Sequence, residues 1–342
     1  MNLTTPIISE NKQHHNYKSL LKDDLPTLTK IQEWADGFPD RDNKFVREFQ
    51  ETFNSSFWEI YLYKLFKTLN FDVKWDNPSP DFELSSQGLD FIVEAATSNH
   101  AVNSQPEWER EISNDKYEYY ISNMNKINEF SIIRHANTLF SKHKRYNDYY
   151  STLEHVIRKP FVVALGSYEI PFFYHQYDRA IMALLYNHYI NEEVFTKEPN
   201  KYPFGPPSEK LDFVQKENGS EIELGLFLND SMREISAVIF NPLATTSKIN
   251  CKADRIDGAH THAWYHNDNT MSQTFKTEEL IEDGLFVFHN PFAKYPLPIE
   301  VFRNERIRQV NYDIETGELL DYFEDKHLAQ RVNFNISYKK LI

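Results

Sequence analysis

The chain has 342 residues, of which 40% are hydrophobic, and its formal net charge is −14 at pH 7. A chain of this length can bury a sizeable core, and its acidity argues against loose binding of nucleic acid, because basic surfaces attract polyanions. The nine glycines form neither common phosphate-binding loop, and the single cysteine, Cys251, excludes an internal disulfide and a cysteine-based zinc site.

The sequence shows neither a membrane-spanning segment nor a signal peptide. The longest apolar runs, FVVAL and AIMALLY, are too short to cross a bilayer. Residues 1–19 lack the basic start and apolar stretch of a signal peptide. We therefore expect a soluble cytoplasmic protein without membrane contact.

The first elements form a helix followed by three strands. Residues 1–43 are polar, and we expect an irregular or partly helical lead. Apolar residues at helical spacing predict a helix over 44–70. Strands are expected at 71–75, 81–84 and 90–96, with SSQG as the hairpin turn between the last two.

The remaining elements predict the fold class. Residues 98–130 are polar, and we expect them to form an insertion. We expect a helix over 131–147 and a buried strand over 159–165 after it. This order predicts an α/β fold with a mixed central β-sheet flanked by helices, its core spanning 44–190. Residues 191–342 hold several further strand patterns and are expected as a β-rich C-terminal extension packed on the core.

This order also brings three acidic residues near one another. Glu59 borders the apolar stripe of the first helix, Asp81 opens the second strand, and Glu94 interrupts the apolar run FIVEAA of the third. Buried carboxylates that lie together repel each other unless a cation neutralises them. Carboxylate oxygens suit Mg²⁺. We therefore expect Asp81 and Glu94 to hold a metal ion.

These motifs resemble a known superfamily. A helix glutamate, the dipeptide Pro80-Asp81 and a hydrophobic strand ending in Glu94 resemble the PD-(D/E)xK nucleases, the superfamily of many restriction endonucleases. The segments FWEIYLYKLFKTLNFDV, SPDFEL and FIVEAAT also resemble a set of bacterial proteins of unknown function. The resemblance covers about residues 45–170. It implies a restriction-endonuclease-like core with Mg²⁺, or alternatively Mn²⁺, at Asp81, Glu94 and Glu59.

The superfamily pattern also contains a lysine, which this chain does not supply at the usual place. The pattern would place it at residue 96, which is alanine here, and some members take the charge from the following helix instead. Lys142 and Lys144 are the two candidates. The related bacterial proteins favour Lys142, four residues before Tyr146, whereas the predicted helix register places Lys144 nearer the apolar stripe. Either amine would stabilise charge at the reacting phosphate.

The resemblance implies a metal-dependent nuclease that hydrolyses phosphodiester bonds, in DNA rather than RNA, with a role in defence against foreign DNA. Residues 171–342 contain no DNA-reading motif, so a homodimer or a recruiting protein partner would supply specificity. Two alternatives stay open. Ala96 and the acidic charge also fit a catalytically inactive nuclease fold that binds or regulates. His260, His262 and His266 fit a zinc hydrolase, because alternate strand residues share a face.

Overall fold

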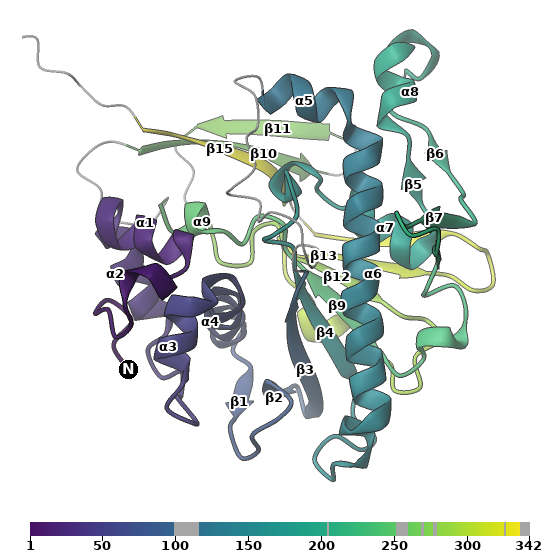
Figure 1. Cartoon of the computed structure of the whole chain (residues 1–342). Helices are drawn as coiled ribbons and strands as arrows, with labels where there is room; N and C mark the ends of the chain where they lie inside the picture. The colour runs from purple at the N-terminus through teal and green to yellow at the C-terminus, as the bar shows by residue number, and fades with distance from the viewer. Residues whose placement is uncertain are drawn as a thin grey trace, which may run out of the picture.

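A mixed β-sheet lies at the centre of the molecule and helices cover both of its faces (Figure 1). The structure is a computed structural model, and it describes residues 1–98, 116–203, 205–250, 259–267, 270–275, 279–324 and 326–335. Within these residues the sheet has eight strands. The predicted α/β class with a mixed central sheet is therefore confirmed.

The order of strands in this sheet shows which of them lie at its centre. It runs β1 (Asp72–Lys74), β2 (Phe82–Ser86), β3 (Leu89–Thr97), β4 (Phe161–Gly166), β9 (Ala237–Phe240), β12 (Phe286–His289), β13 (Arg308–Tyr312) and β14 (Leu319–Tyr322). Strands β3, β4 and β9 are parallel to one another, as are β12 and β13, and the other neighbours are antiparallel. The central strands β4, β9 and β12 are buried along their whole length, which explains their continuous apolar sequences.

The first face of the sheet is covered by helices from the N-terminal part of the chain. These are α1 (His15–Asp23), α2 (Leu25–Trp34), α3 (Phe45–Glu51) and α4 (Phe53–Thr68). The predicted lead of residues 1–43 thus contains two helices. The predicted helix over 44–70 is divided at Thr52, whose backbone angles (φ −126°, ψ 53°) are not helical.

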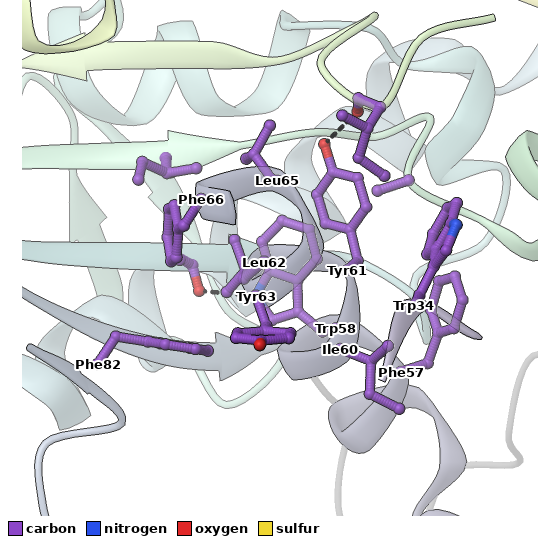
Figure 2. Close-up of a cluster of buried hydrophobic side chains, with 14 of the residues drawn as sticks. Trp34, Phe57, Trp58, Ile60, Tyr61, Leu62, Tyr63, Leu65, Phe66 and Phe82 are labelled. Carbon is purple, nitrogen blue, oxygen red and sulfur yellow. Dashed lines mark hydrogen bonds between the residues drawn. The ribbon is translucent and has the colours of Figure 1, made fainter. Parts of the chain in front are cut away.

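Helix α4 is buried on nearly all sides, because it lies between the sheet and the outer helices. Figure 2 shows the aromatic and aliphatic side chains that it contributes to this core. The Trp58 indole nitrogen donates a hydrogen bond to the Ala164 carbonyl oxygen (3.0 Å), which ties α4 to β4. A helix that is apolar all round is typical of a buried helix, and Glu59 is therefore an unusual residue at its centre.

The opposite face is covered mainly by α6 (Met124–Asp148) and α7 (Arg179–Tyr186), and α5 (Lys116–Ser122) precedes α6 (Figure 1). Helix α6 begins seven residues before the predicted start at 131, so part of the predicted insertion at 98–130 is helical. The first turns of α6 bury Met124 and Ile127, but most of their other residues are polar. Because apolar residues are so sparse there, the helical spacing of these turns was not recognised in the sequence. Residues 99–115 lie outside the described residues.

Residues 191–342 were predicted as an extension packed on the core, but they supply β9, β12, β13 and β14 of the central sheet itself. Pairing between distant segments leaves no mark on local periodicity, which is why the sequence pattern did not reveal it. Three smaller sheets are formed by β10 (Ala259–Asn267), β11 (Thr270–Phe275) and β15 (His327–Asn335), by β5 (Tyr189–Ile190) and β6 (Ser208–Glu209), and by β7 (Phe213–Gln215) and β8 (Glu221–Glu223). The other α-helices of the described residues are α8 (Glu192–Lys197) and α9 (Thr246–Asn250). Among the described helices, none has the length and apolar character that a membrane crossing requires.

Candidate active site

The β2–β3 hairpin brings two of the three predicted acids together. Gln87 and Gly88 form its two-residue turn, and both have positive φ angles (52° and 81°), as a tight hairpin turn of this type requires. The turn determines the register, in which Phe82 is the partner of Val93. One step further along the same register lies Asp81, opposite Glu94.

The strand β2 begins at Phe82, so the last residues of β3 extend beyond it. The Ala95 backbone N–H, which would otherwise lack a strand partner on this side, donates a hydrogen bond to Asp81 Oδ2 (2.8 Å). The side chain of Asp81 therefore takes the place of a neighbouring strand at this point. The open edge of β3 leaves room for groups from both faces of the sheet.

Glu94 lies on the α6 side of β3, with Ile92 and Ala96. Its side chain is only 5% exposed. The Lys142 amine donates a hydrogen bond to Glu94 Oε1 (2.7 Å), and the Tyr150 hydroxyl donates to the same oxygen (3.1 Å). Glu94 Oε2 is buried and has no hydrogen-bond partner among the described residues. One oxygen of this carboxylate is therefore held in place and the other is unsatisfied.

The structure brings Lys142 to the acidic residues and places Lys144 elsewhere. Lys142 is 26% exposed, whereas Lys144 is 76% exposed and forms an ion pair with Asp148 on the helix surface (2.6 Å). The register argument for Lys144 assumed that Phe140 is buried, but it is 36% exposed, and Tyr146 is buried instead. Lys142 lies one helical turn before Tyr146, on the side of α6 that faces the sheet.

Asp81 and Glu59 both have raised pKa values. Burial and then the nearby Glu94 carboxylate raise the pKa of Asp81, whereas Lys142 lowers it, and the net value is about 7. Glu59, which comes from α4 on the other face of the sheet, has a pKa well above its ordinary value, first because of burial and then because of Asp81. The protein thus keeps Asp81 and Glu59 at a place where their charged forms are disfavoured.

A divalent cation fits this set of donors. The unpartnered Glu94 Oε2 and the raised pKa of Asp81 are both features that a cation would relieve. Among the described residues, however, no group of three or more His, Cys, Asp or Glu side chains forms a metal site by itself. A cation held by Asp81 and Glu94 would therefore also need water and substrate phosphate as ligands, which is the usual situation of Mg²⁺.

Tyr150 is a site residue that the sequence analysis missed. It follows α6 in a short 3₁₀ turn (Tyr150–Thr152), it is buried, and its ring lies beside Phe161 of β4. The Arg145 guanidinium lies over its ring, 5.4 Å from the centroid. The sequence YNDYY carries no spacing that marks one tyrosine as a neighbour of Glu94, so only the path of the chain after α6 reveals its role.

A cavity of about 410 Å³ adjoins the acids, between α4, the end of β3 and the middle of α6. Its lining includes Glu59, Ala96 and Lys142, and it extends along α6 to Ser141 and Arg134. The acids therefore lie next to a space that is large enough for a small ligand.

The predicted zinc ligands His260, His262 and His266 belong to β10, which pairs with β11 and β15. Their side chains lie outside what the structure describes, so the geometry of this cluster stays a prediction.

Comparison of the chain with protein-family models, with curated proteins and with solved structures gave no match.

Proposed function

We propose that this protein is a metal-dependent nuclease that hydrolyses phosphodiester bonds in nucleic acid. The observation that carries the proposal is the state of Glu94. Lys142 and Tyr150 bind one of its oxygens, and the other is buried without a partner beside Asp81. Such a carboxylate suits a metal ligand whose orientation is set in advance by its neighbours.

Each residue of the site has a role in this proposal. Asp81 and Glu94 would hold Mg²⁺ or Mn²⁺, which supplies a more acidic bound water and neutralises charge on the phosphate. Glu59 has a pKa raised by burial, which suits a group that orients a water molecule and accepts a proton from it. The Lys142 amine lies at the same carboxylate and stabilises negative charge that develops on the phosphate.

The overall reaction adds water across one phosphodiester bond. The water oxygen bonds to phosphorus and its proton passes to a carboxylate of the site, while the bond from phosphorus to the leaving sugar oxygen breaks and that oxygen takes a proton from solvent water. By analogy with the superfamily that the sequence resembles, the products are a 5′-phosphate and a 3′-hydroxyl. We propose DNA as the substrate rather than RNA, a role in defence against foreign DNA, and a homodimer or a partner protein as the source of specificity.

A second candidate function is nucleic-acid binding without cleavage. It is favoured by the ion pair between Lys142 and Glu94, because this pair already neutralises Glu94 without a metal ion. Ala96 at the position of the superfamily lysine agrees with it. The two functions differ in whether added metal leads to cleavage of the nucleic acid.

The test is cleavage of end-labelled DNA and RNA oligonucleotides with Mg²⁺, Mn²⁺ or EDTA. We expect the wild type to cut in metal and not in EDTA, and Asp81→Asn and Glu94→Gln to be inactive. Asp90→Asn is the matched control, since Asp90 also lies on β3 but pairs with Lys74 at the surface (3.0 Å). Binding without cleavage under every metal condition would favour the second candidate.

A further inference from the structure

The cavity beside the acids extends beyond what phosphate hydrolysis needs. It has a volume of about 410 Å³ and shares Glu59 and Lys142 with the proposed active site, but Asp81 and Glu94 are not part of its lining. The rest of its wall follows α6 toward the N-terminus of that helix, as far as Arg134. Its volume lies in the lower part of the range of small-ligand cavities. It therefore suits one compact group next to the reacting phosphate.

The α6 wall of this cavity has cations at its ends and neutral polar groups between them. Lys142 lies at the end near Glu94, and Arg134 lies eight residues earlier, about 12 Å along the helix axis. Between them the wall carries Asn137, Thr138 and Ser141. This order of charge matches a nucleotide within a strand, in which a neutral sugar and base lie between two anionic phosphates.

One contact and one property of the wall further support a nucleotide as the occupant. The Lys216 amine donates to Asn137 Oδ1 (2.9 Å), which adds a cation near the wall and leaves the Asn137 amide nitrogen as a donor for a ligand. On the β3 side the wall includes Ala95, Ala96 and Thr97, and the small side chains of the two alanines keep the space open. A lysine at residue 96, as in the superfamily pattern, would fill part of this cavity.

We propose that this cavity binds the sugar and base of one nucleotide adjacent to the scissile phosphate, and that the substrate is a strand unpaired at that point. The proposal rests on the proposed function for the identity of the neighbouring phosphate. In a duplex the bases are stacked and paired, so a base enters a cavity of this kind only from a single strand or after it has flipped out. Single-stranded nucleic acid is therefore the preferred substrate class.

The test measures binding separately from cleavage. Fluorescence anisotropy of a labelled single-stranded DNA oligonucleotide is recorded with Asp81→Asn protein in EDTA, so that neither turnover nor metal affects the result. Ser141→Leu or Ala96→Leu is introduced, one at a time, into the Asp81→Asn protein. These substitutions fill the cavity from two different walls, and each is expected to weaken binding about tenfold, equivalent to about 1.4 kcal/mol. Ser122→Leu is the matched control on an exposed serine of α5, and it should leave the affinity unchanged. Circular dichroism melts verify that each variant folds.

The outcomes separate this proposal from the nuclease proposal. If the strand binds, the cavity variants weaken it, and yet the wild type cuts nothing in Mg²⁺ or Mn²⁺, the nucleotide site stands and the nuclease proposal fails. If a folded Ser141→Leu protein binds the strand as tightly as its Asp81→Asn parent, the nucleotide site is overturned whatever the cleavage result. Equal affinity for the same sequence as a duplex would overturn it as well.

Discussion

The ion pair between Lys142 and Glu94 predicts a large and specific effect on stability. Lys142→Met removes the amine and keeps most of the apolar stem. Glu94 is 5% exposed, so its charge would stay in the interior without its cation. Removing one partner of a buried pair costs about 3–5 kcal/mol. Because Lys142 is 26% exposed and Tyr150 still donates to Glu94, we expect a smaller loss, about 2–3 kcal/mol.

Urea denaturation at pH 7 in EDTA measures this loss as a change in the free energy of unfolding. Lys144→Met is the matched control on the same helix, because Lys144 also forms an ion pair, but at the surface (76% exposed). Exposed pairs contribute about 0–1 kcal/mol, so the control should change little. If the two substitutions cost the same, Glu94 does not depend on Lys142 and our account of the site is wrong.

The same pair of variants tests the metal proposal. Without the amine, a divalent cation would be the remaining positive charge available to Glu94. Mg²⁺ should therefore stabilise Lys142→Met more than the wild type, by an amount that grows with metal concentration. Melts of both proteins across a Mg²⁺ titration measure this difference. Melting temperatures that do not respond to metal in either protein would contradict the proposed metal site.

Three other predictions concern the remaining groups of the site. The pKa of Asp81 is about 7 in the folded protein against an ordinary 3.8, so the folded state binds more protons between these values and loses stability as pH rises through them, by up to about 4 kcal/mol. Asp81→Asn should remove this loss and be more stable than the wild type at pH 8 but similar near pH 4 in EDTA melts; parallel curves would contradict it. Tyr150→Phe should cost about 1–2 kcal/mol and lower kcat without raising KM, because it removes only the hydrogen bond to Glu94; a change confined to KM would speak against positioning. Glu59→Gln should abolish cleavage and leave metal-free stability within about 1 kcal/mol, because burial already disfavours the charged form; a strongly destabilised variant would indicate a structural role.

Local patterns in the sequence were sufficient for several elements in the first half of the chain. Apolar spacing predicted the region of α4, and short apolar runs predicted β2, β3 and β4. The turn between β2 and β3 was predicted as SSQG, and the structure shortened it to Gln87 and Gly88, a length that places Asp81 opposite Glu94. The predicted helix and strands depend on residues that lie close together in the chain, so the sequence alone carries them.

The tertiary structure decided what depends on distant segments. The choice of Lys142 over Lys144 required the true rotation of α6 against the sheet, and the contact of Tyr150 with Glu94 joins residues 56 positions apart. The placement of β9, β12, β13 and β14 in the central sheet also depends on pairing between segments that are far apart in the chain. Helical and strand periodicity report which face of an element is buried but not which partner buries it, because the partner is selected by packing across the whole chain.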